Sequence, residues 1–193
     1  QRRFTYPAGR IRIPNDSKSR AGGVLYSDYS LGRFFAEAAR QPWFENTIFL
    51  VTADHCASSA GRTEIPLQKY HIPALILAPG LIEPGVVDGI VSQIDLMPTL
   101  LSLLNMSYDS HFYGRSIFDP AYVNRAFIAT YQDLGYLEGD TFTILSPVRR
   151  FEQYRVVPTE ENPHHLEAME RKDAVQVDRA IGYYQTSCKW NKR

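Results

Sequence analysis

The side chains best suited to chemistry in this sequence are a carboxylate and an imidazole at adjacent positions, Asp54 and His55. They follow the run 47–52, which is apolar and β-branched without alternation, as in a strand of a parallel sheet that is buried on both faces. Ligands of open α/β sheets collect beyond the carboxyl ends of the strands. A carboxylate and an imidazole at such an exit can enter one cleft, where they suit Zn²⁺, Mn²⁺ or a similar divalent ion.

Two ligands alone do not hold a metal well, so the rest of the ligand set must come from elsewhere. An Asp-His pair also occurs in purely structural roles. The strand-exit position and the glycine-bearing loop of small residues at 56–61 favour a metal site at Asp54 and His55.

A histidine and two cations follow this pair. His71 opens the next apolar run, 72–77, and the loop before it carries Arg62 and Lys69. We predict that Arg62 and Lys69 bind an anionic substrate, and His71 is a further candidate site residue. The alternative for His71 is a partly buried histidine at the start of a strand.

Other titratable residues are better explained by structure. Asp95 is the last residue of Ser92-x-x-Asp95, a capping box for the helix behind it. His164 and His165 lie among glutamates, but we interpret this stretch as a solvated polar loop because no rigid element fixes their geometry. Two distant cysteines do not indicate a disulfide framework, and a single bridge stays open.

Composition indicates a folded domain of ordinary size. The chain has 193 residues, of which 44% are hydrophobic and 12% aromatic, so a sizeable core can be buried. Lys plus Arg (21) balances Asp plus Glu (21), which gives no case for a nucleic-acid partner. The sequence contains no run of about 18 apolar residues, so no membrane-spanning helix is expected. Without an initial Met or a signal peptide, the sequence is interpreted as part of a longer protein.

The expected elements alternate early and become strand-rich late. After an extended segment 1–20, a helix is expected from Asp28, its candidate cap, to Arg40–Gln41. The other expected elements are strands 47–52 and 72–77, a helix after Asp95, a strand 126–131, a hairpin 135–145, a strand 151–157, and a helix 174–188. This order predicts an α/β fold with a mainly parallel sheet flanked by helices and a late antiparallel strand cluster.

One block of the chain resembles a known superfamily. Thr52-Ala-Asp54-His55-Cys-Ala-Ser-Ser-Ala-Gly61 is similar to the threonine/serine-x-Asp-His block of the sulfatase and alkaline-phosphatase superfamily. The other stretches resemble the lipoteichoic-acid-synthase-like (phosphoglycerol-transferase-like) sulfatases of bacterial envelopes, in order along essentially the whole chain: Tyr6-Pro-Ala-Gly-Arg10, Tyr26-Ser-Asp28-Tyr, Lys69-Tyr-His71-Ile-Pro73, Ser92-Gln-Ile-Asp95-Leu-Met-Pro98-Thr-Leu, 118–131 and Tyr183-Tyr184-Gln.

The resemblance implies which part of the catalytic site this chain supplies. In the family, an early acidic residue, a nucleophilic threonine (or a modified cysteine in true sulfatases) and the later Asp-His pair hold the metal, and Asp54 and His55 match that pair. Relatives often place a histidine at the position of His71, so the resemblance implies a catalytic residue there that contacts the phosphate or the metal. The early residues lie upstream of residue 1 in relatives, so 1–193 is expected to be the C-terminal portion of the catalytic domain, inactive alone. The Cys-x-Pro-x-Arg pattern of true sulfatases occurs at neither Cys56 nor Cys188.

The expected function is therefore a metal-dependent phosphoryl-head-group transferase, or a hydrolase of phosphodiesters or sulfate esters, in the bacterial cell envelope. The metal would be Mn²⁺, Zn²⁺ or Mg²⁺, with Ca²⁺ as an alternative. The partners would be an anionic lipid head group or a phosphate or sulfate ester, and the upstream half of the same protein. The domain would lie on the extracytoplasmic face of the membrane. The alternative is a non-catalytic, lipid-sensing or regulatory domain with a sulfatase-like fold.

Overall fold

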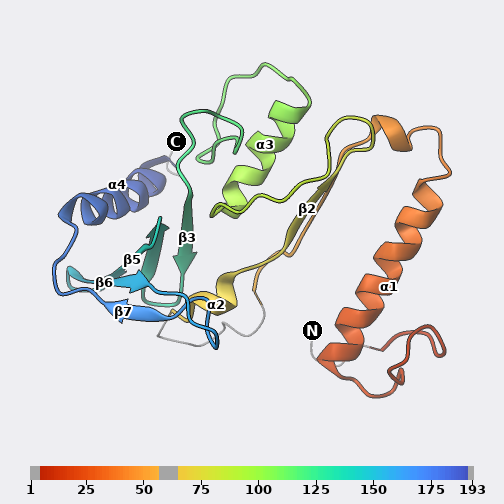
Figure 1. The fold of residues 1–193 in the computed structure, drawn as a ribbon, viewed down its shortest axis with the longest axis horizontal. Helices are drawn as coiled ribbons and strands as arrows, with labels where there is room; N and C mark the ends of the chain where they lie inside the picture. Colours follow the sequence, from red (N-terminus) through yellow and green to blue (C-terminus); the bar gives the residue numbers. More distant parts are fainter. Residues whose placement is uncertain (1–4, 57–64, 191–193) are drawn as a thin grey trace. The chain divides into compact units, whose positions relative to one another are not determined.

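The computed structural model describes residues 5–56 and 65–190 of the chain (Figure 1). These residues divide into two compact units. The first comprises Gln1–Phe49 with Ile76–Pro84, and the second comprises Leu50–Leu75 with Gly85–Arg193. No helix among the described residues is long and apolar enough to cross a membrane.

The first unit is built on helix α1, Arg20–Ala38. The helix begins after Ser19, whose hydroxyl accepts a hydrogen bond from the backbone N–H of Gly22 at 3.0 Å and so satisfies one of the free donors of the first turn. The predicted start at Asp28 is therefore wrong. Ser19 is the stronger capping signal, and Gly22 and Gly23, poor helix formers in the first turns, hid the start of the helix.

The segment before α1 folds back onto the helix and is not simply extended. Tyr6 is 5% exposed and stacks on Tyr26 of α1 with ring centroids 5.2 Å apart. A Cβ placed on Gly22 would lie 2.5 Å from the Tyr6 hydroxyl, so glycine is what allows this approach. The expectation of an extended surface segment at 1–20 is thus corrected for its described part.

Aromatic side chains form the rest of the packing of the first unit. The ring of Phe49 contacts Phe34 and Phe35 of α1, and also Trp43 and Phe44 at the short 3-10 helix η1, Phe44–Asn46. The ring centroids lie 5.3–6.2 Å from that of Phe49, the range of favourable aromatic pairs.

Two short strands pair as a separate sheet, β1 (Phe49–Thr52) and β2 (Ala74–Leu77). The hydroxyl of Thr52, the last residue of β1, donates to the carbonyl of Pro73, directly before β2, at 3.1 Å. The end of β1 therefore lies beside the start of β2. The one-turn helix α2, Leu67–Tyr70, precedes this point.

The second unit is dominated by a five-stranded sheet in the order β3-β4-β5-β6-β7. Every pair in it is antiparallel. The strands are β3 (Arg125–Ala129), β4 (Leu134–Glu138), β5 (Thr141–Ser146), β6 (Arg150–Val156) and β7 (Leu166–Ala168). The late antiparallel cluster is confirmed, and β7 was not predicted because three residues carry no readable alternation.

The α/β class is confirmed. The larger described sheet contains only antiparallel pairs and is the predicted late cluster. The physical reason is that short connections join neighbouring strands antiparallel, whereas parallel pairs need long crossovers. A continuous apolar run such as 47–52 reports burial on both faces and not strand direction.

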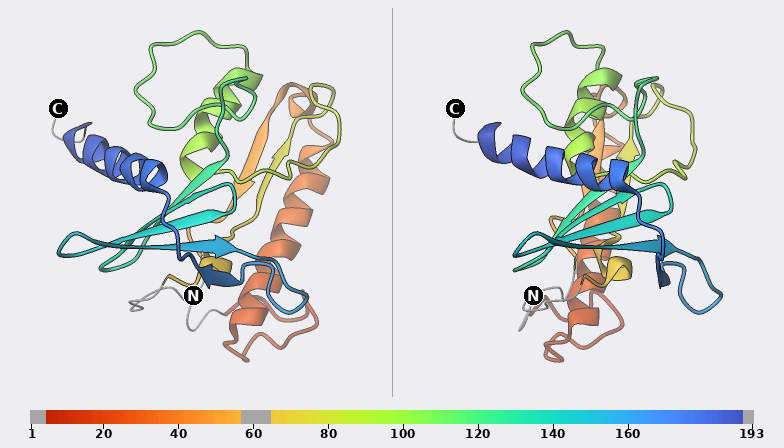
Figure 2. Two further views of the ribbon diagram at one scale, coloured as in Figure 1. Left: turned by 60° about the vertical axis from the view of Figure 1, so that its left-hand side comes forward. Right: turned by 90° about the vertical axis from the view of Figure 1, so that its left-hand side faces the viewer.

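Helix α4, Ala174–Trp190, lies across one face of this sheet (Figure 2). Buried amide groups fasten it. Gln153 of β6 donates to the hydroxyl of Thr143 (2.9 Å) and to Oε1 of Gln176 (3.4 Å), and Gln176 donates to the carbonyls of Glu138 and Thr141 at 3.1 Å. Farther along α4, Tyr184 donates to the carbonyls of Ile128 and Gly135, and burial raises the pKa of this phenol to about 12.

An apolar core lies on the face of the five-stranded sheet opposite α4. It is formed by Ile65, Leu67, Ile128, Leu137 and Phe142.

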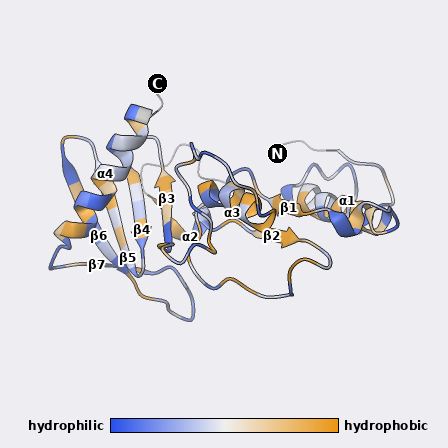
Figure 3. Ribbon diagram, turned by 90° about the horizontal axis from the view of Figure 1, so that it is seen from above, coloured by the Kyte–Doolittle hydropathy of each residue, from blue (hydrophilic) through white to orange (hydrophobic). Residues whose placement is uncertain are grey.

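Between β2 and β3 lie the 3-10 helix η2, Gln93–Asp95, and helix α3, Leu96–Leu103. Pro98 stands in the first turn of α3, where its missing N–H leaves no bond unmade. Much of the hydrophobic colour in Figure 3 falls on α3 and β2, whose sequences are mostly aliphatic.

Candidate active site

The Asp54–His55 turn leaves β1 as an exposed corner with a defined internal geometry. The Asp54 carboxylate accepts the backbone N–H of His55 at 2.9 Å through Oδ1, and its Oδ2 lies 3.4 Å from Nε2 of His55. The imidazole side chain is 77% exposed and the carboxylate side chain 88%. Both groups are therefore open to an ion.

The hydrogen bonds of His55 select the tautomer that a metal needs. Its Nδ1 lies 2.8 Å from the carbonyl oxygen of Cys56, and because a carbonyl can only accept, Nδ1 carries the proton. In the neutral ring the lone pair is then on Nε2, the atom facing Asp54. In a tetrahedral site with bonds of about 2.0–2.1 Å, two ligand atoms lie roughly 3.3–3.4 Å apart, which the Nε2–Oδ2 distance matches.

The donor pair thus fits two corners of a divalent-ion site. Among residues 5–56 and 65–190, no group of three or more His, Cys, Asp or Glu side chains is arranged to hold an ion. Arg62, predicted to bind substrate, lies outside these described residues.

Gln93 anchors the backbone of this turn. Its side-chain amide donates to the carbonyls of Ala53 (2.9 Å) and Asp54 (3.2 Å). Gln93 belongs to η2, whose capping box is as predicted: the Asp95 carboxylate accepts the backbone N–H of Ser92 at 3.2 Å. The Asp54–His55 turn is therefore tied to a segment some forty residues farther along the chain.

Asp95 itself is buried and structural. It is fully buried and receives both guanidinium nitrogens of Arg125, at 2.8 and 3.1 Å, and the hydroxyl of Tyr122 at 2.9 Å. Burial opposes the charge of Arg125, and the bonds to Asp95 outweigh it and raise its pKa. The interpretation of Asp95 as a structural residue agrees with this geometry.

His71 lies on a backbone that is anchored on both sides. It is the C-cap of α2, and the preceding Tyr70 donates from its hydroxyl to the carbonyl of Ala129 at 3.3 Å. On the other side, Pro73 accepts the hydrogen bond from Thr52, two residues before Asp54. His71 is exposed, and half-buried Lys69 stands on α2. The start of β2 and the exit of β1 thus bring His71 to the same sheet edge as the Asp54–His55 turn.

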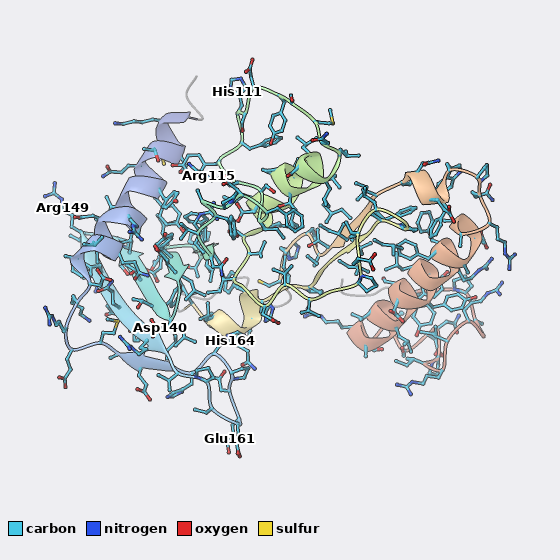
Figure 4. The ribbon with its side chains drawn as sticks, turned by 45° about the horizontal axis from the view of Figure 1, so that its top comes forward. His111, Arg115, Asp140, Arg149, Glu161 and His164 are labelled. Atoms are coloured by element: carbon cyan, nitrogen blue, oxygen red, sulfur yellow. The ribbon has the colours of Figure 1, made fainter. Side chains whose placement is uncertain are left out.

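One unexpected side chain joins His71. The imidazole of His164, from the β6–β7 connection, meets that of His71 edge to face, with ring centroids 5.5 Å apart and an interplanar angle of 82°. Figure 4 shows His164 beside α2, whereas Glu161 stands at the tip of its loop. Burial first, and the neighbouring His71 second, lower the pKa of His164.

The cysteines form no pair. Cys56 is buried beside the metal-ligand turn and Cys188 is exposed on α4, and both are free.

Comparisons with known proteins identify the fold and the family of this chain. The fold is that of the alkaline phosphatase superfamily: a crystal structure from Vibrio parahaemolyticus, described as a protein in that superfamily, superimposes with a TM-score of 0.86 and 31% identity over 97% of this chain and 46% of its own. The family model named Sulfatase matches residues 2–106, more than half of the sequence, and the chain therefore belongs to the sulfatase family.

An arylsulfatase of Clostridium perfringens (strain 13 / Type A) is 30% identical over 107 residues. That alignment covers 51% of this chain and 22% of the arylsulfatase. The chain thus spans less than half the length of either relative.

Sequence reasoning missed three residues of this region, and each had a weak signal. Gln93 stands between the two ends of a recognised capping box, where a long amide is free to reach elsewhere. Arg125 directly precedes an apolar run, and a charge there needs a buried partner. His164 follows Asn162-Pro163, a dipeptide that initiates turns and can fix the next side chain.

Proposed function

We propose that this chain supplies one half of the active site of a metal-dependent enzyme that acts on a phosphate or sulfate ester. The observation that carries the proposal is the 3.4 Å spacing of Asp54 Oδ2 and His55 Nε2, with Nδ1 of His55 held by a carbonyl. Membership of the sulfatase family supports this ester chemistry.

Each residue has a distinct task in the proposal. Asp54 and His55 would hold the ion, and a bound ion would supply polarisation of the ester oxygens and a lower pKa of the attacking group. Gln93 keeps the turn in place, so the two ligand atoms do not have to be ordered when the ion arrives. His71 and Lys69 face the anionic ester, with Arg62 as a further cation.

The kind of enzyme is assigned from the resemblance of the sequence to the phosphoglycerol-transferase-like sulfatases. We propose a phosphoglycerol-transferase-like enzyme of the bacterial envelope, which transfers or hydrolyses an anionic head group on the extracytoplasmic face of the membrane. The remaining metal ligands and the nucleophile come from a preceding segment of the same protein, so 1–193 alone is inactive. The metal is Mn²⁺, Zn²⁺ or Mg²⁺, with Ca²⁺ as an alternative.

Metal titration of the full-length protein tests the site. Calorimetry with Mn²⁺ and Zn²⁺ is performed on the parent, on Asp54→Ala and on His55→Ala, with exposed Asp109→Ala and His165→Ala as matched controls. Both site variants should lose at least about 100-fold in affinity, more than loss of an outer partner costs, and the controls should not change. Unchanged affinity in both site variants would favour a non-catalytic regulatory domain.

Turnover tests the chemistry. Hydrolysis of bis-p-nitrophenyl phosphate and of p-nitrophenyl sulfate is measured with added Mn²⁺ for the full-length protein and for residues 1–193 alone. We expect turnover of at least one ester by the full-length protein and none by the isolated chain. Robust turnover by residues 1–193 would contradict the division of the site between two segments.

A further inference from the structure

We propose that His164 is a second substrate-binding imidazole, which together with His71 clasps the tetrahedral oxyanion of the ester. The inference rests on the proposed function, because it places a new residue on the substrate of that same site. The pair His71–His164 is called the imidazole pair below.

The first argument is that His164 is fixed by its loop. The side-chain oxygen of Asn162 accepts the backbone N–H of His164 at 2.9 Å, and the Thr159 hydroxyl accepts the N–H of Asn162 at 3.0 Å. Next to it, Val157 donates to the carbonyl of His165 at 2.9 Å. In these turns a side-chain oxygen accepts a backbone N–H two or three residues farther along, and such turns order the connection between β6 and β7. The expectation of a solvated loop without fixed geometry is therefore wrong for His164.

The second argument is the anchoring of the opposite ring. Tyr70 and Pro73, one residue before and two residues after His71, are hydrogen-bonded to the end of β3 and to the end of β1. Both imidazoles are thus presented from ordered backbone, at the distance of 5.5 Å between ring centroids. A site that positions its groups in advance loses less freedom when the ligand binds.

The third argument is chemical. Two imidazoles that approach each other penalise each other's protonation, as the lowered pKa of His164 reflects after the larger effect of burial. A dianionic oxyanion that accepts an N–H from each ring removes that penalty. Among the described residues no third His, Cys, Asp or Glu completes a metal site around this pair, so an anion suits it better than a cation.

The fourth argument is location. His71 begins the approach to β2 at the edge where β1 ends, and β1 leads into Asp54 and His55. His164 comes from the connection between β6 and β7 of the five-stranded sheet, so the imidazole pair joins the late antiparallel cluster to the sheet edge that carries Asp54 and His55. The antiparallel cluster would then contribute directly to the substrate site.

Imidazole NMR of the full-length protein tests the binding. Long-range ¹H–¹⁵N spectra at pH 7 are followed while inorganic phosphate, and separately sulfate, is added. The signals of His71 and His164 should shift together with one Kd, and those of His111 and His165 should stay in place. Movement of His71 without His164 would reduce the imidazole pair to a packing contact and overturn the proposal.

Kinetics provide a second readout. For the better ester substrate, His164→Gln should raise KM, and the Kd of phosphate, roughly ten-fold through loss of one charge-assisted hydrogen bond, with a smaller effect on kcat. His165→Gln, one residue away and exposed, is the matched control and should leave both unchanged. A variant that only loosened the loop would lower thermal stability and leave KM unchanged, which would also overturn the proposal.

These measurements separate the inference from the proposed function. If metal binds and turnover occurs while His164→Gln behaves as the parent, the inference alone fails. If the imidazole pair binds phosphate but neither ester is turned over, the proposed function fails and the anion site stands.

Discussion

The residues nearest to the proposed chemistry are exposed, whereas those that hold them in place are buried. Asp54 and His55 are exposed at the end of β1. Gln93 donates to the backbone carbonyls of Ala53 and Asp54, and the buried Asp95 lies two residues after Gln93. The exposed side chains of Asp54 and His55 destabilise the fold little without an ion, because neither has been removed from water. The segment that anchors them is ordered by the buried ion pair between Asp95 and Arg125.

Loss of the Gln93 amide should weaken metal binding without unfolding the protein. In Gln93→Ala, the carbonyls of Ala53 and Asp54 lose their donor, so the turn must be ordered by the ion itself. We expect the Kd of Mn²⁺ to rise about ten-fold, the lower range for loss of an outer partner of a metal site. Calorimetry measures it, with exposed Gln185→Ala on α4 as control. An unchanged Kd would show that the turn is rigid without Gln93.

Removal of Asp95 should destabilise the fold strongly. Asp95→Ala leaves the guanidinium of Arg125 buried and unpaired, which costs about 3–5 kcal/mol. The free energy of unfolding in urea measures the loss. Arg155→Ala is the control, because its ion pair with Asp140 is more than half exposed and such pairs contribute at most about 1 kcal/mol. Equal losses in the two variants would contradict the burial argument.

At the scale of elements, the connection between η2 and the loop after α3 depends on one glycine. A Cβ on Gly114 would lie 2.0 Å from the carbonyl oxygen of Ile94 and 2.9 Å from the nitrogen of Asp95. In the same region Arg115 donates its backbone N–H to Asp95 at 2.9 Å, and Ile117 donates to the hydroxyl of Thr99 at 3.1 Å. The loop is thus held by hydrogen bonds from its backbone N–H groups to the side chains of Asp95 and Thr99. The close approach to η2 requires glycine at position 114.

Alanine at two glycines should act in opposite directions. Gly114→Ala forces backbone atoms apart and should lower the free energy of unfolding by about 1–3 kcal/mol, as overpacking does. Gly182→Ala in α4 meets no atom within 4 Å and should raise it by roughly 0.8–1.0 kcal/mol through helix propensity. Urea unfolding of both variants measures the difference. A Gly114→Ala protein as stable as the parent would show that the loop moves aside freely.

Elements with strong local signals were predictable, and their boundaries depended on capping groups. The capping box at Ser92 and the antiparallel late strands follow from spacing and turn residues. The start of α1 was not found, because the first turn after Ser19 contains two glycines and Asp28 offered a competing cap. The joining of His164 to His71 could not be predicted at all, because a contact between loops has no period in sequence.

At the scale of the whole molecule, the proposed site residues all belong to one of the two compact units. The ligand pair, the imidazole pair and the antiparallel sheet belong to the second unit, and the aromatic packing around Phe49 belongs to the first. The sequence resemblance identified the superfamily, and composition alone excluded only broad classes. The substrate could not be read from either, because its contacts depend on side chains brought together from distant segments.

The stability of the whole protein should fall on mild acidification in part through His164. Because burial and His71 lower the pKa of His164 below its ordinary 6.5, the unfolded chain takes up the proton first, and stability is lost as pH falls through that range. The difference in free energy of unfolding between parent and His164→Gln should therefore shrink from pH 7.5 to pH 5. Urea denaturation at several pH values measures it, and a constant difference would contradict the assigned direction.

The amide network beneath α4 has a consequence for chemical ageing. Gln153 donates to the Thr143 hydroxyl, to the Asp173 carbonyl and to Gln176, while its own oxygen accepts the N–H of Asp173 at 2.7 Å. Hydrolysis of this single amide to a carboxylate would exchange the donor for an acceptor that faces other acceptors. The side chain would keep almost the same volume, yet the attachment of α4 to the sheet would lose one of its buried donors. Deamidation at position 153 should therefore loosen α4 without a change of side-chain size.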